Sequence, residues 1–322
     1  MEDYSISLSV ALAVYNEESR LGDCLESIKH IAKEIVVVDG GSTDRTVSIA
    51  ERYGANIIKT TNPPVFHINK QKALDACRGK WILQLDADER VSKELAEEII
   101  TVTKLSMMEL RGYVVQDKKK RELFLRHEEA MRVRDGALGK DSGEVVAFFV
   151  PRSNYFLGKF LKHGGAYPDG TIRLVQKGKA KYALKDVHDQ MMVDGDVRWL
   201  EHDLLHYADP EFSRYLSRSN RYTSLQSSQW LELKKYLAEK KPAAQAGGQQ
   251  APRSSIQELP SISLTGRARW MFWEPVKTFV KIYFRHKGLL DGFPGFVWAM
   301  YSGLHVATSY VKYWEKSMTK RV

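Results

Sequence analysis

The first 90 residues alternate between short apolar segments and amphipathic ones, and this alternation constrains the fold more than any other feature. Residues 7–14, 34–38 and 81–85 have the length and composition of buried strands. Between the first two, apolar residues recur at helical spacing from residue 21 to residue 31. We therefore predict an α/β fold, in which a mostly parallel sheet is joined by crossover helices.

Two carboxylates follow the predicted strand 81–85, in the stretch LDADE at residues 85–89. In an extended chain, side chains two residues apart point the same way, so Asp86 and Asp88 are expected to aim at one point. Ligands bind at this edge of open α/β sheets, and two carboxylates there suit Mg²⁺ or Mn²⁺ carrying a diphosphate. The alternative is a plain turn in which Ser92 caps the next helix.

A second carboxylate site follows the predicted strand 34–38. Asp39 is placed where it can accept hydrogen bonds from a base or a ribose, and Gly40 and Gly41 permit a tight turn behind it. A plain turn without a ligand is the alternative. No GxGxxG follows the first strand and no GxxxxGK[ST] occurs, which disfavours a dinucleotide-binding fold and a P-loop NTPase.

The charge of the 322-residue chain is concentrated near its end. The whole chain carries +9, and residues 261–322 hold ten Lys/Arg and three Asp/Glu, a balance of +7. Such a segment favours an anionic partner, phospholipid or phosphorylated glycolipid. No nucleic-acid-binding motif accompanies it, so no nucleic acid is expected. A homo-oligomer stays an open alternative.

The two cysteines and the amino terminus indicate the compartment. Cys24 and Cys77 fall in predicted helices without metal or redox spacing, and we interpret them as buried apolar residues in a reducing environment. The first residues are polar and lead into a strand without the apolar segment of a secretory signal. A cytoplasmic location, at the inner face of the cytoplasmic membrane, is therefore expected.

Composition also predicts how the chain is organised. A first domain is expected over residues 1–240, with a charged insertion, either solvated or a mobile loop, at about 116–144. Residues 241–261 are rich in Pro, Ala, Gln, Gly and Ser, and predict a flexible linker to a basic, aromatic helical region at 262–322. Within that region, residues 293–311 lack formal charge, and an interfacial or packed helix is favoured over a transmembrane one.

Taken together, the motifs resemble those of glycosyltransferase family 2, whose members have the GT-A fold, and more narrowly the bacterial lipopolysaccharide-core glucosyltransferases. The resemblance covers about residues 7–222. The matching motifs are VYNE at 14–17, VDGGSTD at 38–44, LDADE at 85–89, GAYPD at 165–169, IRL at 172–174, VHD at 187–189 and HY at 206–207. Beyond that range, KGLLDG at 287–292 also resembles the subgroup.

The resemblance implies an inverting transfer of a sugar from a nucleotide-sugar donor, UDP-glucose or a similar UDP-hexose, to a hydroxyl of a lipopolysaccharide-core or other glycolipid acceptor. It implies a divalent metal, Mg²⁺ or Mn²⁺, held by Asp88 and His206, and Asp189 as the catalytic base. The uridine side would involve Tyr15, Asn16, Glu17, Asp39, Gly40 and Asp86, and the acceptor side Tyr167, Asp169, Arg173 and His188.

Two functions of other classes remain as alternatives. A nucleotide-sugar nucleotidyltransferase also needs a metal and phosphates, but it usually opens with a glycine-rich, basic loop, which residues 13–20 lack. A non-catalytic, membrane-associated sugar-binding protein would not need both the acidic pair and Asp189. Release of UDP from a donor would distinguish an enzyme from such a module.

Overall fold

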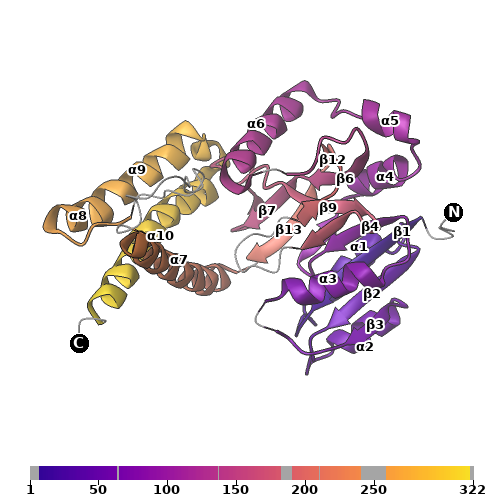
Figure 1. The fold of residues 1–322 in the computed structure, drawn as a ribbon, viewed down its shortest axis with the longest axis horizontal. Coiled ribbons are helices and arrows are strands. Elements are labelled where there is room, and N and C mark those ends of the chain that lie inside the picture. Colours follow the sequence, from indigo (N-terminus) through magenta and orange to yellow (C-terminus); the bar gives the residue numbers. More distant parts are fainter. Residues whose placement is uncertain are drawn as a thin grey trace. The chain divides into compact units, whose positions relative to one another are not determined.

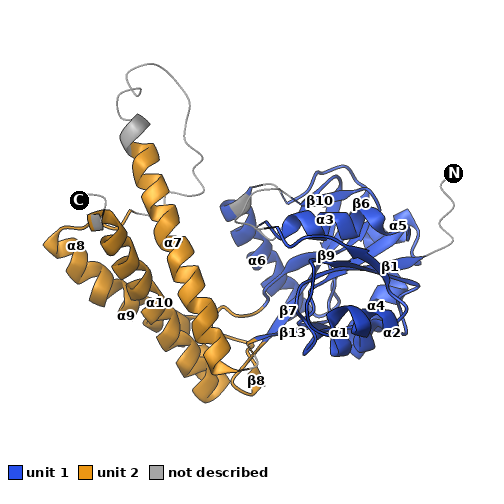
Figure 2. Cartoon of the chain, turned by 90° about the horizontal axis from the view of Figure 1, so that it is seen from below, with its two compact units in different colours: residues 1–154, 168–208 blue, residues 155–167, 209–322 orange. Residues whose placement is uncertain are grey.

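The computed structural model describes residues 7–63, 65–136, 138–182, 191–209, 211–240 and 259–319. The chain forms two compact units, one made of residues 1–154 with 168–208 and the other of residues 155–167 with 209–322 (Figure 2). The predicted linker 241–261 lies mostly outside the described residues, so the predicted domain boundary there stays a prediction.

A seven-stranded sheet forms the centre of the first unit, in the order β12-β6-β9-β4-β1-β2-β3 (Figure 1). β1 runs parallel to β2 and to β4, and β2 runs parallel to β3, whereas β9 is antiparallel to β4 and to β6. The predicted α/β class with a mostly parallel sheet is thereby confirmed. The strands are β1 (Leu8–Val14), β2 (Glu34–Asp39), β3 (Asn56–Lys59), β4 (Trp81–Leu85), β6 (Val145–Val150), β9 (Thr171–Gln176) and β12 (Asp196–Trp199).

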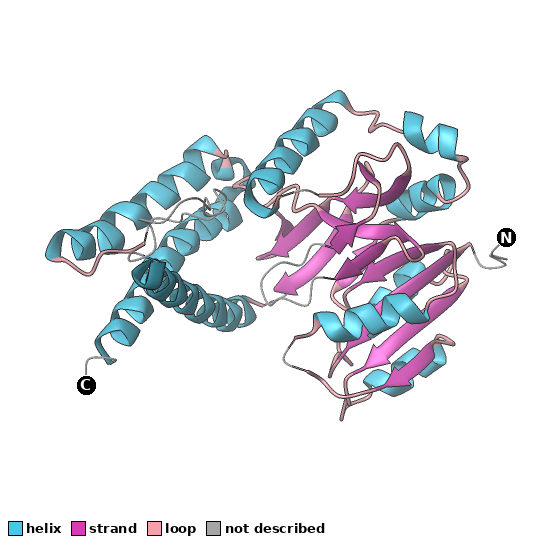
Figure 3. Ribbon diagram, viewed as in Figure 1, coloured by secondary structure: helices cyan, strands magenta, loops and turns pink. Residues whose placement is uncertain are grey.

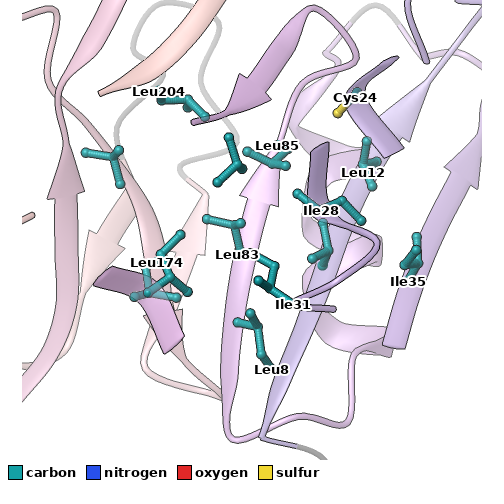
Figure 4. Packing of buried hydrophobic residues seen from close by; sticks show 14 of the residues in the cluster. Leu8, Leu12, Cys24, Ile28, Ile31, Ile35, Leu83, Leu85, Leu174 and Leu204 are labelled. Carbon is teal, nitrogen blue, oxygen red and sulfur yellow. The ribbon is translucent and has the colours of Figure 1, made fainter. Parts of the chain in front are cut away.

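Helices cover this sheet and close its core (Figure 3). Apolar residues of α1, α2 and α4 pack on β1, β2 and β4, and Figure 4 shows Leu12, Ile28 and Leu83 in this cluster. Cys24 and Cys77 are free and buried, as predicted. The helices of this unit are α1 (Leu21–Ile28), α2 (Thr46–Arg52), α3 (His67–Ala76), α4 (Lys93–Val102), α5 (Met107–Gly112) and α6 (Lys118–Asp135).

Helix α6 excludes one of two alternatives. We expected a solvated insertion or a mobile loop at 116–144, and residues 118–135 are not a loop: they form a helix that Asp117 caps by accepting hydrogen bonds from two backbone N–H groups. Phe124 and Met131 of this helix are buried. The loop alternative was wrong because a few apolar anchors suffice to hold a helix whose other positions are mostly polar.

Short strands complete the first unit and begin the second. β5 (Glu89–Val91) pairs antiparallel with β13 (Leu204–Asp209), which sets His206 opposite Glu89. β10 (Ala180–Tyr182) pairs with β11 (Met191–Val193). In the second unit, the last residues of β7 (Arg152–Phe156) form a hairpin with β8 (Lys159–Phe160).

The second unit is helical. α10 contacts both α7 and α9, and it buries Val297, Ala299 and Tyr310, so residues 293–311 belong to a packed helix. Among the described residues, no helix is both long enough and apolar enough to cross a bilayer. The elements are α7 (Phe212–Lys240), α8 (Leu264–Ala268), the π-helical turns η3 (Arg269–Trp273) and η4 (Lys281–Arg285), α9 (Glu274–Val280) between them, the 3₁₀ turn η5 (Gly288–Asp291) and α10 (Gly292–Thr319).

Candidate active site

The carboxyl ends of three neighbouring strands bring the predicted site together. Val14 at the end of β1 pairs with Asp39, and Leu12 pairs with Leu85, the residue before Asp86. Asp39 and Asp86 therefore lie on either side of the end of β1. Since neighbouring strands are about 5 Å apart, the two backbones are roughly 10 Å apart, a distance that one nucleotide can bridge.

The turn after β2 is organised by Asp39 itself. One carboxylate oxygen of this buried residue accepts hydrogen bonds from the backbone N–H groups of Gly41 and Ser42, both at 3.1 Å. Gly40 leaves little room, because a Cβ there would lie 3.1 Å from that of Asn62. These bonds fit a plain turn, and the predicted contact of Asp39 with a nucleotide stays a prediction.

The segment after β1 is tied to the same turn. Asn16 has a positive φ of 54°, its backbone N–H donates to Ser42 Oγ at 2.9 Å, and its Oδ1 accepts from the backbone of Thr43 at 2.9 Å. Glu17 forms an ion pair with Arg20. Tyr15, in contrast, is 44% exposed and presents its ring to solvent beside these fixed groups.

Asp86 is held by two cations. Lys70 Nζ lies 2.7 Å from Oδ1, and Arg173 Nη2 lies 2.7 Å from Oδ2. Burial alone would raise the pKa of Asp86, but the charges of Lys70 and Arg173 outweigh it and hold the pKa well below its ordinary value. The same Arg173 nitrogen lies 2.6 Å from Glu89 Oε1, so this guanidinium, predicted for the acceptor, is buried among protein carboxylates.

Asp86 and Asp88 do not follow the alternation of an extended strand. β4 ends at Leu85, and the backbone N–H of Glu89 donates to the carbonyl of Asp86 at 3.0 Å, which closes a turn. The two carboxylates accordingly have different partners, and Asp88 Oδ2 accepts from Arg20 Nη1 at 3.2 Å. The extended chain that our expectation assumed is therefore absent, and a common target of the two carboxylates stays a prediction.

The other oxygen of Asp88 faces His206. Asn154 decides which proton this imidazole carries: its Nδ2 donates to Asp169 Oδ2 at 3.2 Å, so its Oδ1 must be the atom that lies 2.6 Å from His206 Nδ1. Nδ1 therefore holds the hydrogen, and Nε2 presents a lone pair. That Nε2 lies 3.7 Å from Asp88 Oδ1.

The surroundings keep His206 neutral and Asp169 charged. Burial and the positive charge of Arg152 lower the pKa of His206 to about 4, against the opposing pull of Asp88. Burial would raise the pKa of Asp169, but Arg152, which lies 2.7 Å away, and the Asn154 hydrogen bond lower it below its ordinary value. Asp88, His206, Asn154, Asp169 and Arg152 thus form one continuous polar network in the first unit.

Comparison with known proteins identifies the fold's chemistry. Residues 9–105, which include β1, β2 and β4 with their polar ends, match the family model described as "Glycosyl transferase family 2". Over this segment the chain is a glycosyltransferase of family 2. Its activity is therefore that of a glycosyltransferase, and the recognition made from the motifs is confirmed.

Two relatives of this family 2 glycosyltransferase match it over very different shares of its length. The lipopolysaccharide core biosynthesis glycosyltransferase LpsC of Rhizobium meliloti is 26% identical over 98% of this chain and 94% of its own length. An uncharacterized glycosyltransferase of Rickettsia bellii is 40% identical, but over only 29% of this chain and 31% of its own length.

Solved structures match only a small part of the chain. Glucosyl-3-phosphoglycerate synthase from Mycobacterium tuberculosis, solved with Mn²⁺ and UDP-glucose, is 26% identical with a TM-score of 0.24. The match covers 27% of this glycosyltransferase and 34% of that chain.

Three predicted residues of the glycosyltransferase are not among the described residues of the first unit. Asp189 and His188 lie outside the described residues, so their predicted roles as base and acceptor contact stay predictions. Tyr167 belongs to the second unit, where Lys162 Nζ lies 4.5 Å from the centre of its ring.

Sequence reasoning missed the cations of this glycosyltransferase site. Lys70, Arg20 and Arg152 partner its carboxylates, and none stands within a motif that we singled out. One signal was present for Lys70: the predicted helix around it has no apolar stripe, and in α3 the polar side chains of His67, Asn69 and Lys70 are buried. A helix that must pack on a sheet with polar residues indicates partners of opposite charge beneath it.

Proposed function

We propose that this glycosyltransferase moves a hexose, with inversion, from a UDP-sugar such as UDP-glucose to a hydroxyl of a lipopolysaccharide-core or similar glycolipid acceptor, assisted by Mg²⁺ or Mn²⁺. One observation carries the metal and the donor: Asp88 Oδ1 and His206 Nε2 are both acceptors, and they face each other across 3.7 Å. Two acceptors in that arrangement repel unless a cation stands between them.

The residues fit a divalent cation. Two ligands at right angles on a metal with bonds of about 2.1 Å are about 3 Å apart, so a small side-chain movement brings Asp88 and His206 into range. The described residues contain no group of three or more His, Cys, Asp or Glu that could hold a metal. Mg²⁺ sites with few protein ligands complete their shell with water and substrate phosphates, which fits a nucleotide diphosphate donor.

The outer shell of this pair supports the proposal. Asn154 fixes the His206 ring through Nδ1, as partners of metal-binding histidines commonly do. When bound, the metal would neutralise the charge of the departing diphosphate. Arg20 lies 3.2 Å from Asp88, so its positive charge would add to that of a metal bound there.

The rest of the first unit supplies the nucleotide contacts that we propose. The exposed Tyr15 ring can stack on the uracil, and the carboxylates of Asp39 and Asp86 can accept from the uracil and ribose. In the transfer, the bond from C1 to the diphosphate oxygen breaks as the acceptor oxygen bonds to C1. Asp189 is proposed to take the acceptor proton, because a free Asp, with a pKa of about 3.9, is ionised at neutral pH.

The acceptor is proposed from the relative that spans nearly the whole chain. The R. meliloti protein is named for lipopolysaccharide core biosynthesis and matches 98% of this chain. An acceptor of that class is anchored in a membrane, and the +7 balance of residues 261–322 fits attachment to the inner face of the cytoplasmic membrane.

Donor screening followed by transfer tests this function. UDP- and ADP-sugars are compared by thermal shift with and without Mn²⁺, since a ligand at 100 times its Kd adds about 2.7 kcal/mol of stability. The best donor is then offered with lipopolysaccharide core as acceptor. We expect a UDP-hexose to stabilise the enzyme only when Mn²⁺ is present. We also expect the sugar to be incorporated into the lipopolysaccharide core.

Other outcomes would reject the proposal. Formation of nucleoside triphosphate from the sugar nucleotide and pyrophosphate would identify a nucleotidyltransferase. Binding of sugars without UDP release, under conditions where a metal and a core acceptor are present, would identify a binding module.

A further inference from the structure

The outer face of the helix from Leu264 to Arg285 carries a column of exposed apolar side chains. Phe272, Val276, Val280 and Phe284 are spaced four residues apart, and each is 46–71% exposed. Most other apolar side chains of this helix face inward. An apolar row of this length on a helix that already packs elsewhere needs a partner.

The inner face of the same helix already has its partner. Trp270 stacks on Tyr310 with ring centres 6.2 Å apart, and Phe279 meets Phe296 at 5.8 Å, so α10 covers this side. The column is therefore not the packing face of the second unit. It is a separate surface, turned away from the core that α7 and α10 share with this helix.

Two π-helical turns limit how far the column winds around the helix. In a regular α-helix, residues four apart advance by about 40° around the axis, so four such positions would wind away from one face. The wider turns η3 and η4, at the two ends of the column, reduce that drift. Phe272 lies in η3 and Phe284 in η4, and Val276 and Val280 lie in α9 between them.

A second column, one residue further along, consists of one tryptophan and three cationic side chains. Trp273, Lys277, Lys281 and Arg285 follow the four apolar residues at the same spacing, and all four are exposed. From residue 264 to residue 290 the chain holds six Lys/Arg and one Glu, a balance of +5. An apolar row bordered by Lys and Arg, with an aromatic side chain at its end, is the composition of helices that lie in a membrane interface.

We infer that this surface, the apolar column 272/276/280/284 with the cationic column 277/281/285, docks the enzyme on an anionic phospholipid surface. The cations match the negative headgroups and the apolar column enters the boundary with the acyl chains. The surface lies on α9 and its flanking turns, and not on residues 293–311, whose helix is packed. The inference rests on the proposed function only in that a glycolipid acceptor lies in a membrane.

The charge of the surface distinguishes lipid from a second copy of this chain. A cationic, isologous face would set Lys277, Lys281 and Arg285 against the same residues of its copy, and like charges in close contact are unfavourable. An anionic lipid surface instead pairs with every cation at once.

Flotation of the full-length enzyme on vesicles tests the inference, without donor or metal. Vesicles of phosphatidylcholine alone are compared with vesicles that contain phosphatidylglycerol, at low and high salt. The apolar variant is Phe272→Gln, Val276→Gln, Val280→Gln and Phe284→Gln, and the cationic variant is Lys277→Gln, Lys281→Gln and Arg285→Gln. Gln keeps helix propensity, and the matched control changes Leu225, Leu304 and Val311, which are exposed apolar residues of α7 and α10, to Gln.

We expect the wild type and the control to float with the anionic vesicles. The cationic variant should lose roughly 100-fold in partition at low salt, at about 1 kcal/mol for each cation. The apolar variant should lose the part of the binding that persists at high salt. Circular dichroism melting of each variant identifies any that fail to fold.

Three results would overturn the inference. They are equal flotation of the apolar variant and the wild type at high salt, loss of flotation in the control as well, and no flotation of the wild type on either vesicle. A wild-type dimer that the apolar variant abolishes, without vesicle binding, would assign the face to a second copy. Transfer to a water-soluble core fragment is measured in parallel, so failure of docking and failure of the proposed activity appear in different assays.

Discussion

Asp88 and His206 face each other through two hydrogen-bond acceptors, Oδ1 and Nε2, which lie 3.7 Å apart. They meet because β5, which begins at Glu89, pairs antiparallel with β13 and sets His206 opposite Glu89. Asn154 fixes the orientation of the imidazole, because its Oδ1 lies 2.6 Å from His206 Nδ1, the other nitrogen of the ring. A positive charge between the two acceptors would turn their repulsion into attraction.

The first prediction concerns the base. Asp189→Asn keeps the shape of the side chain and removes its basicity, so kcat should fall by at least ~10²-fold while UDP affinity stays nearly unchanged. Steady-state transfer and calorimetric UDP titration check this. If turnover survived while nucleotide affinity collapsed, Asp189 would be a binding residue and the base would have to be sought elsewhere.

The second prediction concerns the buried pair of Arg173 and Glu89, which are 2.6 Å apart. Arg173→Met leaves Glu89 without its main partner and should lower the free energy of unfolding by about 3–5 kcal/mol. Adding Glu89→Gln should cost less than the sum of the two single changes, because the double variant buries no carboxylate at position 89. Urea denaturation of the wild type, the two single variants and the double variant gives the coupling free energy between the two residues.

An exposed pair serves as the control for that cycle. Glu18 and Arg45 are 3.1 Å apart, but the Arg45 side chain is 81% exposed, so water and salt screen their attraction. We expect no measurable coupling between them. Additive effects at Arg173 and Glu89 would show that the buried network does not act as a unit.

The third prediction concerns acid stability. Burial raises the pKa of Glu34, but hydrogen bonds from Ser9 Oγ at 2.5 Å and from Arg78 at 2.7 Å lower it below its ordinary value. The folded pKa is thus below the unfolded one, so the stabilisation is present above pH ~4.3 and is lost as pH falls through the folded pKa. Glu34→Gln should cost ~1.5–3 kcal/mol at pH 7.

Urea unfolding from pH 7 down to pH 3.5 checks the sign. The difference between the wild type and Glu34→Gln should shrink as the pH falls, whereas Glu51→Gln, at an exposed position of α2, should show no such trend. A difference that grows toward low pH would mean that the pKa of Glu34 is raised in the folded protein.

Much of the fold was predictable because strand and helix periods are local properties of the sequence. The strand 81–85 was predicted with the bounds that β4 has, and the order of helices and strands over the first 90 residues followed from the same periods. The partners of the carboxylates were not predictable in this way. Lys70 and Arg173 are 103 positions apart, and only the tertiary fold sets both against Asp86.

The same limit explains the two corrections. The turn after Leu85 is closed by a backbone bond between Asp86 and Glu89, and β-alternation gives no sign of where a strand stops. Helix α6 is held by a few buried residues such as Phe124, among charges that by themselves indicate solvent. In both cases a contact outside the local pattern decides the local structure.

The proposed transfer depends most directly on a divalent metal between Asp88 and His206, and Mn²⁺ binding in the presence of UDP tests whether the two residues hold one. Electron paramagnetic resonance of free Mn²⁺ is measured as the wild type, Asp88→Asn, His206→Gln and the exposed control Asp23→Asn are added with saturating UDP. We predict tight binding by the wild type and the control, and at least ~10-fold weaker binding by each of the other two. Equal Mn²⁺ affinity in all four proteins would contradict the account.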